Sequence, residues 1–253
     1  MTTFAPLAPS APLPRRVLVF LVVLYAVCVI ACALTRDFGF YSDDKLHAET
    51  VRVTYESGVL LPRYYHYPSL GYVISLLASL PSFAAQGFDA QALAAELAEA
   101  LRCGLLPPPR LVLDGRLAFA AVSDLALFWV ALLAWRLSSS RLAACAAALV
   151  LASSFEFHYH ARQWAPDAPM AQFACLSVML AHQYATTRAK RHFFGAAVAA
   201  GLAAGTKFPG ALALSALGVA ILAVEVSGDG SRLAAFARSA RAGFLALLVL
   251  FAT

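Results

Sequence analysis

Long apolar runs separated by short polar connectors constrain this chain more than any other feature. The clearest run, residues 111–135, is long enough to cross a bilayer core, which needs about 20 residues. Only 13% of the 253 residues are charged, against roughly 25% in soluble domains. Since the backbone inside lipid must satisfy its own hydrogen bonds, such runs predict helices. We therefore expect an all-α polytopic membrane protein and no nucleic-acid partner, despite a net charge of +5.

Six apolar stretches qualify as membrane helices, and a seventh begins near the end of the chain. The predicted spans are residues 17–34, 111–135, 142–157, 168–184 and two short helices within 193–226 that meet at Lys207, with the seventh starting at residue 242. Residues 69–85 are also apolar but contain Pro81 and are barely long enough to cross.

The distribution of basic residues predicts the orientation. Arg15 and Arg16 precede the first span, and the connectors 136–141, 188–191 and 227–241 are rich in Arg and Lys. The positive-inside rule places these segments in the cytoplasm. We expect a cytoplasmic tail over residues 1–16 and a membrane domain over 17–253, whose first extracytoplasmic loop covers 35–110. This parity requires residues 69–85 to be re-entrant or interfacial.

The first loop is the one long polar passage of the chain. It contains the adjacent acids Asp43 and Asp44 and an aromatic run over residues 64–68. Leucines at 93, 97 and 101 share one helical face, so residues 89–102 predict an amphipathic helix on a membrane surface. We interpret the membrane helices as a scaffold for this loop.

Several polar residues are candidates for chemistry, each with an alternative structural role. Asp43 and Asp44 suit general-base catalysis or cation binding, although a solvated capped turn is also compatible with them. Asp167 follows Pro166 at a helix start and could simply cap it. Lys207 interrupts an apolar stretch, where it either snorkels or meets an anion. Asp124 is an acid within a predicted span, which is a functional hypothesis by default.

The order of these motifs resembles a known family. The runs SDDKLHAETVR, ESGVLLPRYY and HYPSLGY, then Arg162 with Pro166-Asp167, then GLAAGTKFPGAL around Lys207, occur in that order. The pattern is similar to type-C glycosyltransferases that use polyprenyl-phosphate sugars, including protein O-mannosyltransferases and lipid A aminoarabinose transferases. Asp44 replaces the usual Glu, and Tyr67 and Ser69 replace a Lys and a Pro of that pattern.

The resemblance implies a type-C transmembrane helix bundle with juxtamembrane helices in the first extracytoplasmic loop. Family members have more spans, so the resemblance implies that this chain is an N-terminal half that is incomplete at its C-terminus. The implied reaction is an inverting hexosyl or pentosyl transfer to a lipid, glycan or protein acceptor in a bacterial inner membrane.

The resemblance also implies roles for individual residues. Asp43 would be the general base and Asp44 would assist it. If the reaction needs a divalent cation, Asp44 and Asp167 are the candidate ligands. The residues expected to bind substrate or lipid phosphate are Arg63, His66, Arg162, Asp167 and Lys207.

Two other functions are compatible with the sequence. A transporter subunit would use polar residues at mid-membrane, and Asp124 is the one residue that favours it. A non-catalytic membrane scaffold or truncated remnant would explain the small number of spans.

Overall fold

The computed structural model describes residues 12–35, 42–59, 68–103, 110–226 and 232–252. Every regular element in these ranges is helical, and they contain no strand. The predicted all-α class is confirmed. The elements are α1 (Arg15–Leu34), α2 (Ser42–Ser57), α3 (Leu70–Ala85), α4 (Ala90–Cys103), α5 (Arg110–Ser123), α6 (Ala126–Ser138), α7 (Arg141–Ala152), α8 (Phe155–Ala161), α9 (Asp167–Thr187), α10 (Lys190–Thr206), η1 (Phe208–Ala213), α11 (Leu214–Val226) and α12 (Arg232–Ala252).

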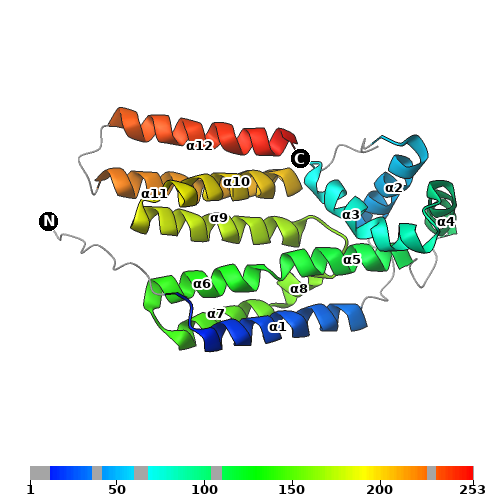
Figure 1. The fold of residues 1–253 in the computed structure, drawn as a ribbon, viewed down its shortest axis with the longest axis horizontal. Helices are drawn as coiled ribbons and strands as arrows, with labels where there is room; N and C mark the ends of the chain where they lie inside the picture. The colour runs from blue at the N-terminus through cyan, green and yellow to red at the C-terminus, as the bar shows by residue number, and fades with distance from the viewer. Residues whose placement is uncertain (1–11, 36–41, 60–67, 104–109, 227–231, 253) are drawn as a thin grey trace.

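The long helices lie side by side along one axis, and α2, α3 and α4 gather at one end of this bundle (Figure 1). The end that carries α2–α4 also contains α8, the start of α9 and the turn between α10 and η1. The opposite end contains the connectors that the sequence marks as basic, between α6 and α7 and between α9 and α10. Two polar segments, residues 42–59 (the first polar island) and residues 158–167 (the second polar island), thus lie toward the end of the bundle opposite to the basic connectors.

Two helical stretches are long and apolar enough to cross a membrane within the described ranges: Arg15–Leu34 and Arg110–Ser138. Two pairs of helices are each bent at a short break, and they would be two further candidates if each pair formed one span. The pair α7 and α8 bends by 61°, and the pair α3 and α4 bends by 107°. The six spans expected from sequence are therefore not all supported by length and composition. The predicted span at residues 168–184 falls within α9, which has 21 residues but buries the amides of Gln172 and Gln183.

The break at Lys207 is confirmed as the junction of two helices. Helix α10 ends at Thr206, and η1 begins at Phe208. A Cβ on Gly210 would lie 2.3 Å from the backbone of Ala203, so only glycine lets η1 pack directly on the last turns of α10.

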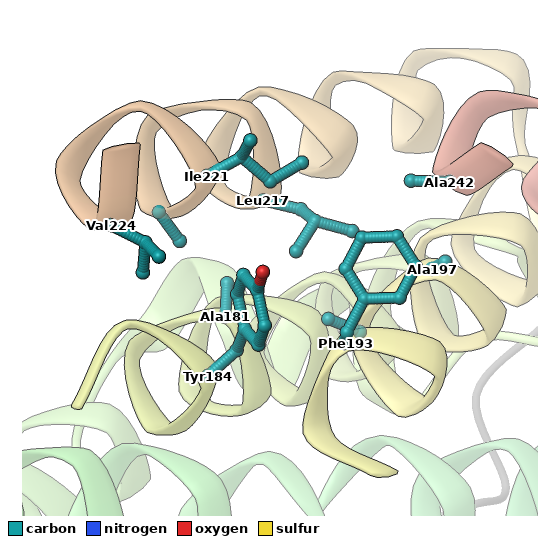
Figure 2. Close-up of a cluster of buried hydrophobic side chains, with 10 residues drawn as sticks. Ala181, Tyr184, Phe193, Ala197, Leu217, Ile221, Val224 and Ala242 are labelled. Carbon is teal, nitrogen blue, oxygen red and sulfur yellow. The ribbon is translucent and has the colours of Figure 1, made fainter. Parts of the chain in front are cut away.

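Small side chains allow the helices of this half to approach closely. Helix α10 buries Ala196, Ala197, Ala200 and Ala203 completely, and it packs on α9 and α12. Larger residues fill the remaining space between α9, α10 and α11 (Figure 2). This alternation of small contact residues and large fillers is typical of helix packing in membranes.

The amphipathic helix predicted at residues 89–102 is present as α4, but its predicted location is wrong. Leu93 and Leu97 are each only 1% exposed, and Leu97 packs in one cluster with Ala48 and Val51 of α2. The leucine face therefore covers α2 and is not available to a membrane surface.

A second core holds the α2–α4 end together around Trp164, which is fully buried. The indole ring lies against α5 where that helix has Gly115. A Cβ at this position would be 2.6 Å from the ring, so the glycine makes room for the tryptophan.

We predict that Gly115→Ala lowers the free energy of unfolding by about 1–3 kcal/mol, because the methyl group overlaps the Trp164 ring. The control is Gly218→Ala in α11, where the added Cβ meets nothing within 4 Å. Thermal unfolding of both variants in detergent is the measurement. Equal midpoints for the two variants would contradict the packing described here.

Candidate functional site

A buried ion pair joins the first polar island to the bundle. Asp44, in the first turn of α2, accepts a hydrogen bond from Arg116 Nη2 of α5 at 2.5 Å. Its other carboxylate oxygen accepts the backbone N–H of Trp164 at 2.8 Å. Asp44 and Arg116 are 0% and 1% exposed. The first and second predicted motifs are therefore in direct contact.

Asp44 occupies a structural position in this core. Each carboxylate oxygen has a donor, and no solvent reaches the group. Removing one partner of such a buried pair typically costs 3–5 kcal/mol, because the other charge is left uncompensated. The predicted catalytic residue Asp44 is thus placed as the connection between α2, α5 and the 162–166 segment.

A neutral histidine completes the same core. Ser75 Oγ donates to the Gly71 carbonyl and accepts from Trp164 Nε1 at 2.7 Å. Its hydrogen is then used, so His47 Nδ1, at 2.9 Å, donates to it. The imidazole stacks on the Trp164 indole with ring centroids 5.8 Å apart. Burial lowers the pKa of His47 to about 3, since the charged form would lose its solvation.

The second motif also contacts this core through Pro166, and the third motif is joined to the second by the Asp167–Lys207 pair. A Cβ on Gly71 would lie 3.2 Å from His47 Cε1 and 3.9 Å from Pro166 Cβ, so these residues meet where α3 passes the loop. The next residue, Asp167, begins α9 and accepts from Lys207 Nζ at 2.6 Å. The ion pair is about 30% exposed, so it is accessible to a ligand.

Asp43 is the acid beside this core that is not fully buried. It precedes Asp44 on α2, and successive helical residues are rotated by about 100°. The two carboxylates therefore leave the helix in different directions. Because Asp44 is held on both oxygens, the backbone that carries Asp43 is held as well.

The structure describes only one of the three remaining predicted substrate-binding residues, Arg162. Arg63 and His66 lie outside the described residues. Arg162 is partly buried and lines a crevice between α1 and α7. Within the described ranges, no three His, Cys, Asp or Glu side chains are grouped so that they could hold a metal ion.

Two residues that organise this site were not selected from the sequence. Arg116 is a cation inside an otherwise apolar run, and that mismatch is a signal for a buried acidic partner. Trp164 lies in the second polar island, but its burial depends on Gly115 of a helix far away in sequence. No local pattern predicts this contact.

We predict that His47 makes stability depend on pH. In the unfolded chain His47 binds a proton below about pH 6.5, whereas the folded protein keeps it neutral down to about pH 3. The contribution of the neutral His47 to the free energy of unfolding is complete above pH ~6.5. Below that pH it falls by about 1.4 kcal/mol per pH unit. The variant His47→Asn keeps a donor toward Ser75 but does not titrate. The measurement is the free energy of unfolding of both proteins between neutral pH and about pH 5. As the pH falls, the wild type should lose stability relative to His47→Asn. A difference independent of pH would contradict a buried neutral histidine.

Comparison with known proteins finds a family model that covers the second half of the chain. The family model described as dolichyl-phosphate-mannose-protein mannosyltransferase matches residues 113–253, which is more than half of the chain. The match includes Arg162, Asp167 and Lys207 but begins after Asp43 and Asp44. Searches of curated proteins and of solved structures gave no significant match. The chain belongs to the dolichyl-phosphate-mannose-protein mannosyltransferase family, and is a membrane glycosyltransferase by that membership.

Proposed function

We propose that the chain transfers a sugar from a polyprenyl-phosphate donor to a hydroxyl acceptor at the extracytoplasmic end of the bundle. The observation that carries this proposal is the hydrogen bond from the Trp164 backbone to Asp44, with Asp43 beside it. Arg162 and Pro166 are each two residues from Trp164, so the backbone places each of them within about 7 Å of Trp164. An acid that could act as a base and a cation that could bind phosphate are thus held by one core.

In the proposed reaction, Asp43 takes the proton of the acceptor hydroxyl as its oxygen attacks the anomeric carbon. The bond from that carbon to the phosphate oxygen breaks, and the bonding electron pair leaves with the lipid phosphate. Attack from the face opposite the phosphate inverts the anomeric configuration. General-base assistance of this kind contributes typically 10²–10⁴-fold to a rate.

The departing phosphate gains negative charge, and we propose Arg162 and Lys207 as the groups that stabilise it. Lys207 already holds an anionic partner, Asp167, in a partly exposed pair. An incoming phosphate could share or replace that carboxylate, which would give Asp167 a role in substrate exchange. Arg63 and His66 keep their proposed roles in substrate binding.

Asp44 has a different role in this proposal from the one that the sequence suggests. Its two oxygens are occupied and it is fully buried, so it neither takes a proton nor contacts the substrate. We propose that it positions Asp43 relative to Arg162.

The proposed side of the membrane follows from charge. At the end opposite to α2–α4, Arg136 lies in the last turn of α6 and Arg141 begins α7. Arg188 follows α9 there, and Lys190 begins α10. Cytoplasmic loops carry such an excess of basic residues. The end with Asp43 would then face outward, where lipid-linked sugars meet extracytoplasmic acceptors.

We expect Asp43→Asn to reduce sugar transfer at least about 100-fold while the protein still inserts and folds, because the amide cannot take the acceptor proton. The assay follows radiolabelled polyprenyl-phosphate mannose in native membranes that contain the variant. Asp89→Asn is the matched control, since Asp89 is an exposed cap of α4 and Asn caps equally well. Normal transfer by Asp43→Asn would refute the assignment of the base.

A further inference from the structure

The bend between α7 and α8 opens a crevice beside α1. Leu21 of α1 and Ala148 of α7 belong to one buried cluster, so the two helices are packed together at that level. Helix α7 then ends at Ala152, and its direction changes by 61° into α8, whereas α1 continues to Leu34. A crevice of about 270 Å³ lies beyond that level, with walls from α1, α7 and α8.

A capped helix start fixes the bend, and small side chains leave the resulting space open. Ser154 Oγ accepts the backbone N–H of Phe157 at 3.3 Å, which caps the first turn of α8. Ala31 of α1 and Ala152 of α7 line the crevice. A larger side chain at either position would occupy part of this volume. The sequence thus creates the space and keeps bulky side chains out of it.

The walls of the crevice are mostly apolar and open to the side of the bundle. Leu24, Val27 and Leu149 contribute to them, and the last two are 56% and 48% exposed. Helix α1 is long and apolar enough to cross a membrane, so its exposed apolar side chains face lipid. The crevice therefore opens laterally toward the bilayer.

Arg162 supplies the crevice with a cation at its polar end. His158 and Arg162 are four residues apart at the end of α8, so they share one face of that helix. Cys28 Sγ of α1 lies 3.9 Å from His158 Nε2. The Arg162 Nε atom is buried, and among the described residues it has no hydrogen-bond partner. A buried donor without an acceptor is unfavourable, which favours an anionic ligand at this end.

The same arginine connects the crevice to the candidate site. Arg162 follows α8 directly and is two residues from Trp164, so at most about 7 Å of backbone separates them. The backbone N–H of Trp164 donates to Asp44 at 2.8 Å. An anion bound to Arg162 would therefore lie close to the core that carries Asp43.

These features fit an amphiphile with an anionic head and a single hydrocarbon tail. Whole ligand pockets usually measure about 300–1,000 Å³, so this crevice would hold only one segment of a long lipid. A phospholipid has two acyl chains and would need room for both of them beside its phosphate. A prenyl phosphate has one tail, which is attached directly to its phosphate.

We propose that this crevice is the lateral binding site of the prenyl-phosphate donor. The phosphate meets Arg162, and the tail segment nearest to it lies between α1 and α7. The rest of the tail leaves past Val27 and Leu149 into the bilayer, and Ala31 and Ala152 determine how much tail can enter. The inference rests on the proposed function, since it takes the donor to be a prenyl phosphate.

The first experiment locates the tail without any sugar transfer. The full chain in phosphatidylcholine nanodiscs is photolabelled with farnesyl phosphate that carries a diazirine on its tail, and the labelled peptides are identified by mass spectrometry. Label should appear on peptides from both α1 and α7, and unlabelled farnesyl phosphate should compete it away. Label on other helices alone would overturn the proposal. Equal competition by phosphatidylglycerol would also overturn it, because the crevice would then be a general site for anionic lipids.

Variants then separate the tail from the phosphate. Ala152→Phe should weaken the binding of farnesyl phosphate and of farnesol, which has no charge, at least about tenfold, because the ring takes the space of the tail. The matched control is Ala146→Phe, since Ala146 is an exposed residue of α7 that does not line the crevice. Wild-type binding by Ala152→Phe would contradict the proposal.

Arg162→Gln should weaken the binding of farnesyl phosphate on the order of tenfold and leave that of farnesol unchanged, because only the phosphate meets the guanidinium. Unchanged binding of farnesyl phosphate by this variant would show that the head group lies elsewhere and would overturn the proposal.

The outcomes also distinguish this inference from the proposed function. If the label falls outside α1 and α7 while Asp43→Asn still abolishes transfer, the crevice is not the donor site and the base assignment stands. If the label falls on α1 and α7 and depends on Ala152 and Arg162 while Asp43→Asn transfers normally, the crevice proposal is supported and the base assignment fails.

Discussion

The buried ion pair between Asp44 and Arg116 is the interaction on which the rest of the structure depends. It fixes the start of α2 on α5, and the other carboxylate oxygen of Asp44 accepts the backbone N–H of Trp164. From Trp164 the connection continues through Ser75 to α3 and through Pro166 toward α9. A buried pair is not in itself strongly stabilising, because desolvation offsets much of its Coulomb energy. We infer that its main effect here is specificity, because it favours a docking of α2 that pairs both charges.

The two ends of the bundle are built on different physical principles. Around Trp164, polar groups are buried and paired, and aromatic rings fill the space between them. Around Phe193 and Tyr184, the packing is apolar, with alanines that bring α9, α10 and α12 together. The apolar half gives a rigid support that lipid can surround. The polar half holds Asp43 next to the buried Asp44 and pairs Lys207 with Asp167.

The all-α class, the break at Lys207 and the grouping of the polar islands could be predicted from the sequence. The all-α class follows from hydropathy, and the break follows from Thr206-Lys207-Phe208-Pro209 within an apolar stretch. The grouping follows from the alternation of basic connectors with the polar islands along the chain. The burial of Asp44 could not, because its partners Arg116 and Trp164 lie 72 and 120 residues away. The apolar face of α4 was assigned to the membrane for a similar reason: periodicity identifies an apolar face but not the surface that covers it.

The stabilities of Asp43→Asn and Asp44→Asn, measured side by side by unfolding in detergent, test the central claim most directly. Both variants remove one acid from adjacent positions of one helix. If Asp44 holds the site together and Asp43 acts on substrate, Asp44→Asn should lose about 3–5 kcal/mol because Arg116 is left buried without a counter-charge. Asp43→Asn should then remain within about 1 kcal/mol of the wild type. Equal losses, or a larger loss for Asp43→Asn, would contradict the division of roles between the two acids.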